Sequence, residues 1–346
     1  MNAVFRTLAV AVAVAAALTL SLPTAATVAA DEVNVYSSRK EELIKPLLDR
    51  FTAQTGIAVN LVTGKEDALL QRLKSEGANS PADLLVTTDA GNLYRAKAAG
   101  VTQPLVSDTL STAIPAVFRD PEGHWVGLTM RARPILYVKG KVDPATLSTY
   151  EALAGPNFKG RICIRSSDNI YNQSLVASLI AANGEAATET WATGLVANLA
   201  RPPKGGDRDQ IKAAAAGECE IAVANTYYLA GMLTGKDPAD RTAAESMAVF
   251  WPNQDGRGAH VNVSGAALTA AAKHKDAAVQ LVEFLASPES QQWYAQENGE
   301  YPVRDGVAVS ATLTAWGPFK ADSLNLARLG ELNAPAVKLM DRAGWK

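Results

Sequence analysis

The chain of 346 residues carries 33 lysines and arginines against 35 aspartates and glutamates, and 48% of its residues are hydrophobic. This hydrophobic share excludes a disordered or fibrous chain, and the length indicates about two domains. The near balance of charge lacks the basic excess of a general nucleic-acid binder, so we expect no nucleic-acid partner.

The first thirty residues differ in character from the rest of the chain. Arg6 gives a positive start, residues 8–22 form an apolar run, and Val28-Ala29-Ala30 provides small residues before Asp31. This pattern predicts a cleaved secretory signal peptide over residues 1–30, with an uncleaved membrane anchor as the alternative. No cysteine stands at the cut, which argues against a lipid anchor. We therefore expect a soluble, exported protein.

The mature chain opens with alternating strand and helix patterns. Predicted strands cover residues 33–36, 57–62 and 83–88, and predicted helices cover residues 40–54, 66–76 and 91–99. Pro46 fits the first helix only near its start or as a kink. The alternation predicts an α/β fold with a parallel sheet that is covered by helices on both faces.

A second series of such units begins near Pro134. Predicted strands cover residues 135–138, 161–165, 220–224 and 261–267, and predicted helices cover residues 149–153, 173–182, 189–199, 209–216, 277–285 and 288–296, with a helical stretch from Ser310. We therefore predict two lobes, the first from residues 31–133 plus 258–308 and the second from residues 134–257 plus 309–346. Exported two-lobed proteins hold ligands in the cleft between their lobes and close by a hinge motion.

The two cysteines, Cys163 and Cys219, each lie in or beside a predicted strand. Export to an oxidising compartment favours a disulfide between them, and two buried free thiols are the alternative. The chain has no CxxC motif and no cluster of cysteine and histidine, so the sequence does not indicate zinc.

Four of the nine tyrosines fall near the ends of predicted strands: Tyr36, Tyr171, Tyr227 and Tyr228. Open α/β sheets bind ligands at the carboxyl ends of their strands. Phenols titrate near pH ~10, so a cluster of them favours a highly charged cation that displaces their protons. Fe³⁺ is such an ion and prefers anionic oxygen. Each tyrosine taken alone is more often structural, and a neutral sugar could stack on the rings.

Three arginines are candidates to lie beside an anionic cluster of phenolates. Arg131 is favoured first and Arg39 second, with Arg133 third, either to stabilise phenolate or to hold an anion such as carbonate. The alternative for each is an ordinary surface or inter-lobe arginine.

Five segments spread over the mature chain carry a combined signal. They are Val35-Tyr36-Ser37-Ser38-Arg39, Ser80-Pro81-Ala82-Asp83 with Asp89-Ala90-Gly91, Asn225-Thr226-Tyr227-Tyr228, residues 253–265, and Glu300-Tyr301-Pro302-Val303. Together they resemble the periplasmic ferric-iron-binding proteins of ABC transporters, in the tyrosine-rich branch of that family. Each segment alone would be a weak signal.

The resemblance implies a two-lobed periplasmic-binding-protein fold of type II that closes on Fe³⁺ and delivers it to an inner-membrane ABC permease. It implies a periplasmic binding protein rather than an enzyme, and we expect a monomer. The tyrosines that match the family's iron ligands are Tyr36, Tyr171, Tyr227 and Tyr228. We expect Arg39 and Arg131 to lie beside them and to stabilise the phenolates or hold an anion. Some members carry a histidine where this chain has Val35. Water or carbonate could fill the coordination position that this leaves.

Two other functions stay open at this point. The first is a periplasmic receptor for another small ligand, such as thiamine, a polyamine or an oxyanion. The second is a secreted hydrolase on an α/β scaffold. The hydrolase would need a nucleophile–base pair, and the sequence shows no GxSxG, P-loop or HExxH motif.

Overall fold

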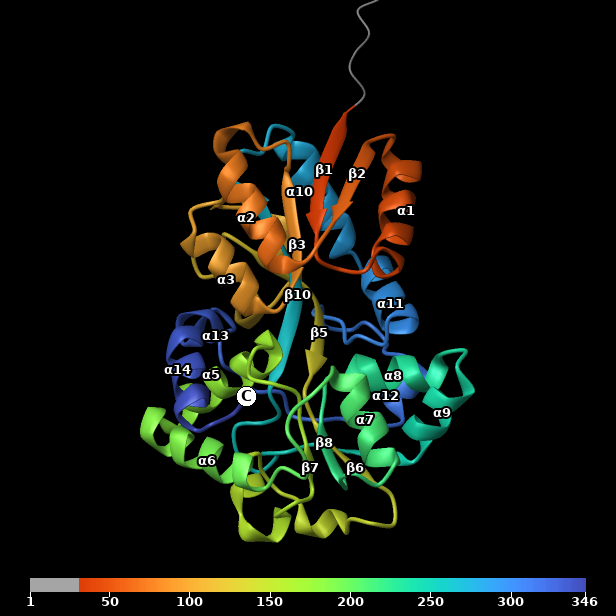
Figure 1. Cartoon of the computed structure of the whole chain (residues 1–346). Coiled ribbons are helices and arrows are strands. Elements are labelled where there is room, and N and C mark those ends of the chain that lie inside the picture. The colour runs from red at the N-terminus through yellow and green to blue at the C-terminus, as the bar shows by residue number, and fades with distance from the viewer. Residues whose placement is uncertain (1–30) are drawn as a thin grey trace, which may run out of the picture. The chain divides into compact units, whose positions relative to one another are not determined.

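Two β-sheets organise residues 31–346, which are the residues that the computed structural model describes (Figure 1). The predicted signal peptide of residues 1–30 lies outside the described residues. In residues 31–346, no helix is long and apolar enough to cross a membrane.

The first sheet has six strands in the order β2–β1–β3–β10–β4, with β5 paired to β10. The strands are β1 (Glu32–Ser37), β2 (Ala58–Thr63), β3 (Leu84–Thr88), β4 (Thr102–Gln103), β5 (Val126–Ala132) and β10 (Val261–Thr269). Strand β1 runs parallel to β2 and β3, as predicted, whereas β10 runs antiparallel to β3, β4 and β5. The predicted parallel sheet therefore holds for β1, β2 and β3 but not for the rest of the sheet, because the chain re-enters it through β10 in the opposite direction.

The second sheet has four strands in the order β7–β8–β6–β9. They are β6 (Ile135–Val138), β7 (Ile162–Cys163), β8 (Ile221–Val223) and β9 (Met247–Phe250). Only β7 and β8 are parallel, and β6 pairs antiparallel with both β8 and β9. The fold is thus mixed α/β with two sheets. The exact lobe boundaries stay a prediction.

Helices accompany both sheets. Those in the part of the chain that forms the first sheet are α1 (Lys45–Thr55), α2 (Glu66–Glu76), α3 (Ala90–Ala98), α4 (Asp108–Ala113), α10 (Lys275–Leu285) and α11 (Pro288–Glu297). The others are α5 (Ile170–Asn183), α6 (Glu185–Ala197), α7 (Asp207–Ala215), α8 (Thr226–Thr234), α9 (Pro238–Glu245), α12 (Ala311–Thr314), α13 (Ala327–Glu331) and α14 (Asn333–Arg342).

Helix α1 shows how local sequence sets these boundaries. It begins at Lys45 rather than at residue 40, with Pro46 in its first turn, where the missing N–H of proline costs no hydrogen bond. Its buried face carries Leu47 and Phe51. The helix ends at Thr55 and is capped by Gly56, which adopts a left-handed conformation with φ of 77° that favours glycine.

Strands β5 and β10 connect the two sheets (Figure 1). They pair with each other, and β5 continues through Arg133 and Pro134 into β6 of the second sheet. The predicted strands do not include β5, although its apolar residues Val126, Leu128 and Met130 alternate with Gly127, Thr129 and Arg131 as in a strand.

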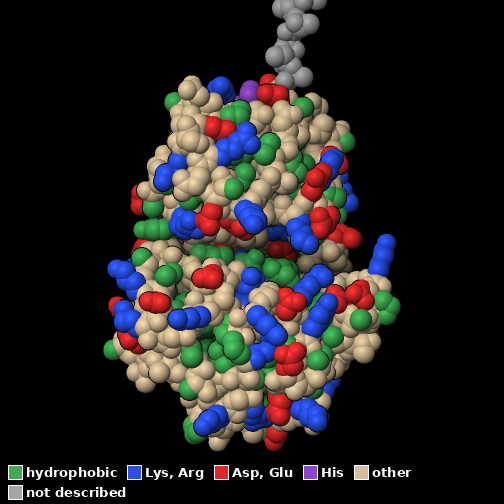
Figure 2. Space-filling view, in the orientation of Figure 1, with side chains coloured by type: hydrophobic (Ala, Val, Ile, Leu, Met, Phe, Trp, Pro, Cys, Tyr) green, Lys and Arg blue, Asp and Glu red, His purple; other side chains and the backbone are tan. Residues whose placement is uncertain are grey.

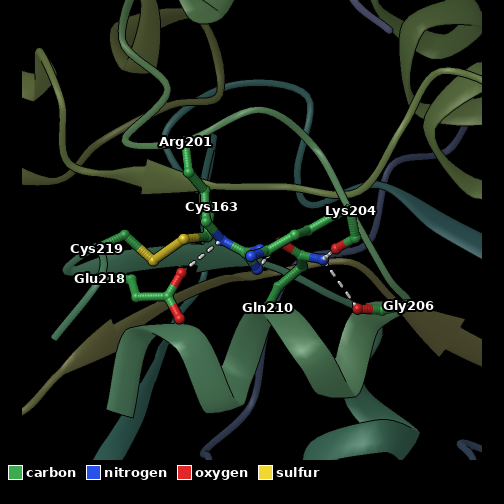
Figure 3. Close-up of a disulfide and its surroundings, with 7 residues drawn as sticks. All are labelled: Cys163, Arg201, Lys204, Gly206, Gln210, Glu218 and Cys219. Carbon is green, nitrogen blue, oxygen red and sulfur yellow. Dashed lines mark hydrogen bonds and ion pairs between the residues drawn. A yellow bond between two sulfur atoms is a disulfide. The ribbon is translucent and has the colours of Figure 1, made fainter. Parts of the chain in front are cut away.

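Cys163 and Cys219 form a disulfide, which confirms the favoured prediction. The bond ties the end of β7 to the segment that enters β8, and its Cα atoms are 5.9 Å apart. Nearby, Arg201 forms an ion pair with Glu218 at 3.3 Å and donates to Gln210 of α7 (Figure 3). The disulfide belongs to a hydrophobic cluster of the second sheet, and Tyr228 packs against the same cluster.

Candidate functional site

A pocket of about 240 Å³ contains three of the four predicted tyrosines. The space-filling view shows a groove across the middle of the molecule, with charged side chains along both rims (Figure 2). The pocket residues that the argument uses are Ser38, Arg39, Glu66, Thr88, Arg131, Tyr171, Arg208, Tyr227, Tyr228, Ser264 and Glu300. Some of them belong to the part of the chain that forms the first sheet, and the others belong to the part that forms the second sheet.

The ends of parallel strands supply this pocket. Strands β1 and β3 are parallel, so Ser38 and Thr88 lie at the same edge of the first sheet. In the second sheet the parallel strands β7 and β8 lead to α5 and α8, and the three tyrosines occupy the first turns of these helices. The positive end of a helix dipole favours a negative group, so these positions suit a phenolate.

The three tyrosines are in direct contact. The hydroxyl of Tyr227 donates to the hydroxyl of Tyr171 at 3.1 Å, and the rings of Tyr227 and Tyr228 lie 4.3 Å apart between centroids. The side chain of Asn169 accepts from the backbone N–H of Tyr171 and caps α5, which fixes the start of that helix. We call Tyr171, Tyr227 and Tyr228 the tyrosine trio.

The surroundings favour the protonated form of two of these phenols, Tyr227 and Tyr228, in the unliganded protein. Burial and the neighbouring Tyr171 raise the pKa of Tyr227 well above its usual value. Burial, Tyr171 and then Asp207 likewise raise the pKa of Tyr228. A guest with high positive charge could displace these protons and gain several anionic oxygens at once.

Arg131 lies beside the trio with unused hydrogen-bonding capacity. Its side chain is 2% exposed, and its Nε and Nη2 atoms have no hydrogen-bond partner. Its Nη1 donates to Ser264 at 3.4 Å, Asp89 lies 3.7 Å from Nη2, and the guanidinium lies 5.6 Å from the ring centre of Tyr171. Buried donors without partners are costly, so this group suits an anion in the pocket.

Arg39 also lines the pocket, but its two terminal nitrogens are engaged, and only its Nε lacks a partner. Its two terminal nitrogens donate to the carboxylate of Glu300 at 3.1 and 2.7 Å, and both side chains are buried. Glu300 also accepts from Thr129. This bidentate pair neutralises the charge of Arg39, so Arg131 is the better anion-binding candidate of the two.

The structure does not bring Tyr36 to the pocket, which corrects the prediction of four converging hydroxyls. Its side chain is 1% exposed and packs against Leu69 and Leu73 of α2. Its hydroxyl donates to both carboxylate oxygens of Glu76, at 3.0 and 3.1 Å, and Arg72 lies 4.6 Å above its ring. Successive strand residues point to opposite faces, and Tyr36 faces α2.

Sequence reasoning missed several charged residues of the pocket. Glu66 begins α2, just after β2 ends, and accepts from the hydroxyl of Thr88 at 3.2 Å. Arg208 of α7 reaches the pocket beside Gly231 of α8. The rule that selected the tyrosines at strand ends would also have found Glu66 and Thr88.

Two observations limit which side chains could bind a metal ion and which pocket could hold it. No group of three or more histidine, cysteine, aspartate or glutamate side chains within residues 31–346 could hold a metal ion. A larger surface hollow of about 820 Å³ lies beside α4 and residues 304–305, and it contains none of the predicted site residues. The pocket with the tyrosine trio therefore offers tyrosine oxygens to a metal, together with single carboxylates such as that of Glu66.

Comparison with known proteins identifies the family of this chain. The family described as bacterial extracellular solute-binding protein matches residues 47–321. The iron uptake protein A1 of Synechocystis is 52% identical over 315 residues, which cover 91% of this chain and 88% of that protein. The Trichodesmium protein IdiA or FutA, solved with iron and citrate, is also 52% identical, with a TM-score of 0.89 over 91% of this chain and all of that one. The ferric binding protein from Campylobacter jejuni is 41% identical, with a TM-score of 0.87 over 91% of this chain and all of that one.

The fold and the match define the class: this chain is a bacterial extracellular solute-binding protein, a binding protein rather than an enzyme. Within that class it belongs to the family of periplasmic ferric-iron-binding proteins, as the resemblance predicted. Solute-binding proteins of this kind serve ABC transporters.

Proposed function

We propose that this protein captures Fe³⁺ in the periplasm through the tyrosine trio and delivers it to an inner-membrane ABC permease. The observation that carries the proposal is the contact of the Tyr171 and Tyr227 hydroxyls at 3.1 Å, with the ring of Tyr228 against that of Tyr227 in the same pocket. Three phenolates would neutralise a trivalent ion, so a half-buried site can hold it without a net charge.

The trio supplies three oxygens, so the remaining coordination positions need other donors. We infer that water or a small anion such as carbonate fills them, because Arg131 has two buried nitrogens without partners. The Trichodesmium relative was solved with citrate as well as iron, which supports an anionic co-ligand. The chain itself offers a carboxylate at Glu66, which lines the pocket from the side of the first sheet.

Capture and release would follow from the movement of two lobes. We propose lobes with the predicted boundaries, 31–133 plus 258–308 and 134–257 plus 309–346, acting in a monomer. The tyrosine trio belongs wholly to the second lobe, so this lobe would bind the ion first. Closure would then bring Ser38, Glu66 and Thr88 of the first lobe over it.

The direct test is metal analysis and a visible spectrum of the purified mature protein after loading with Fe³⁺. We expect one iron per chain and a visible phenolate-to-iron charge-transfer band. A protein that stays colourless and free of iron would overturn the proposal. Thermal stabilisation by thiamine, a polyamine or an oxyanion in metal-free buffer would then support the alternative receptor.

A further inference from the structure

Arg133 occupies the junction between the two sheets. It directly follows β5 and is 1% exposed. Its backbone N–H donates to the carbonyl of His260, just before β10, and its carbonyl accepts from the hydroxyl of Tyr150 at 2.8 Å. These contacts fix the position of Arg133 relative to the strands that connect the sheets.

The side chain of Arg133 joins the helix starts that carry the tyrosine trio. Its Nη2 donates to Asn172 of α5 at 2.8 Å, next in sequence to Tyr171. Its Nη1 donates to Asn225 at 3.0 Å, the residue that precedes α8. The same Nη1 donates to Asp207 at 2.8 Å, and Asp207 accepts from the backbone N–H of Asn225 at 2.7 Å.

The geometry of these bonds depends on a guanidinium. Its planar fork presents donors in fixed directions, so the acceptors on α5 and α8 are held at a fixed separation. A lysine ammonium carries a comparable charge, but it cannot meet several acceptors in the same fixed geometry. A buried ion pair adds little net stability over apolar packing, so its contacts support a role in geometry.

We propose that Arg133 is a positioning residue that sets the distance between the hydroxyls of Tyr171 and Tyr227 and couples the connecting strands β5 and β10 to the metal pocket. This inference rests on the proposed function. Arg133 touches none of the trio's hydroxyls and acts through the helix starts. A change in the path of β5 during lobe movement would thus reach both helix starts through Arg133, in addition to the bond from the Ala132 N–H to Thr226 of α8.

The test compares Arg133→Lys with Arg201→Lys as a matched control. Arg201 also has a mostly buried side chain paired with an acid, Glu218, but it contacts neither α5 nor α8. We expect Arg133→Lys to weaken Fe³⁺ binding by about 10-fold to 100-fold and to shift the charge-transfer band, as outer partners of metal ligands do. Arg201→Lys should keep both the affinity and the band. Equal changes in both variants, or a wild-type band in Arg133→Lys, would overturn the inference.

A second variant decides the matter if Arg133→Lys does not fold. The side-chain carbonyl of Asn225 accepts from Arg133, its amide nitrogen has no partner, and it makes no capping bond to α8. Asn225→Ala therefore removes only this arm of the network, and we expect a smaller shift of the same band. An unchanged band would overturn the inference. If the wild type shows no band with iron, the proposed function itself fails, which is a distinct result.

Discussion

Tyr36 and the tyrosine trio carry the same phenol group near the carboxyl ends of strands, yet the partners of their hydroxyls differ. Tyr36 lies near the carboxyl end of β1, and the tyrosine trio lies in the first turns of the helices that follow β7 and β8. The hydroxyl of Tyr36 is satisfied within the protein by Glu76, which also accepts from Arg72 and Ser80. The hydroxyls of Tyr171 and Tyr227 bond to each other, and within residues 31–346 no hydroxyl of the trio is hydrogen-bonded to a charged side chain.

Arg39 and Arg131 repeat the same contrast. Both terminal nitrogens of Arg39 bind Glu300 and only its Nε lacks a partner, whereas Arg131 has both Nε and Nη2 without partners. A buried polar group must find a partner, and the partner can come from the protein or from a guest. The difference teaches that a binding residue is recognised by buried polar atoms without a hydrogen-bond partner as much as by its residue type.

The largest effect should come from Tyr227→Phe. It removes the oxygen at the centre of the trio, so we expect Fe³⁺ affinity to fall by more than about 100-fold, beyond the loss typical of an outer partner. Competition with a coloured iron chelator measures this affinity. An affinity within about threefold of wild type would show that the trio does not hold the ion, since threefold is below 1 kcal/mol.

Acidification should weaken iron binding by the next largest amount. The raised pKa values of Tyr227 and Tyr228 keep these phenols protonated without iron, so binding must release protons. Up to about three protons should leave per iron bound, and affinity should rise with pH over the range in which the free phenols stay protonated. Proton release into weakly buffered solution measures this number. Release of no protons would contradict phenolate ligation.

Arg131→Gln should have a moderate effect. It removes the charge that faces an anionic co-ligand, so we expect Fe³⁺ affinity to fall by about 10-fold. The loss should be larger with carbonate present than in carbonate-free buffer. Arg131→Lys, which keeps the charge, should recover part of the affinity. Identical losses of affinity in both buffers would show that Arg131 does not bind the anion.

Tyr36→Phe should have the smallest effect on iron. We expect Fe³⁺ affinity within about twofold of wild type, because the hydroxyl points to Glu76 and away from the pocket. The variant should instead lower the free energy of unfolding by about 1 kcal/mol, the usual value for a lost hydrogen bond. A large loss of iron affinity would show that Tyr36 takes part in iron binding.

The stability cost of Tyr36→Phe should depend on pH. Burial acts to raise the pKa of Glu76, but hydrogen bonds from Arg72, Ser80 and Tyr36 outweigh it, so the folded pKa lies below the unfolded one. Stabilisation from this network is therefore complete above the unfolded pKa and is lost as pH falls through the folded pKa. Urea unfolding of both proteins at neutral and acidic pH should show the difference shrinking in acid. A constant difference would mean that Glu76 does not contribute.

The sequence predicted much of this arrangement but not all of it. Strand ends located Tyr171, Tyr227 and Tyr228, because parallel strands bring the helix starts that follow them to one edge. The same rule failed for Tyr36, whose hydroxyl partner Glu76 lies forty residues away and depends on which face of β1 carries α2. The contacts of Arg133 were equally hidden, because they join residues from three separate helix starts.

The central claim is that the tyrosine trio, without Tyr36, provides the phenolates for iron. The most direct measurement is the visible spectrum of Tyr227→Phe and Tyr36→Phe, each mixed with equimolar Fe³⁺ beside the wild type. We predict that the charge-transfer band is unchanged in Tyr36→Phe and is strongly reduced or shifted in Tyr227→Phe. A band that survives in Tyr227→Phe and disappears in Tyr36→Phe would contradict the account.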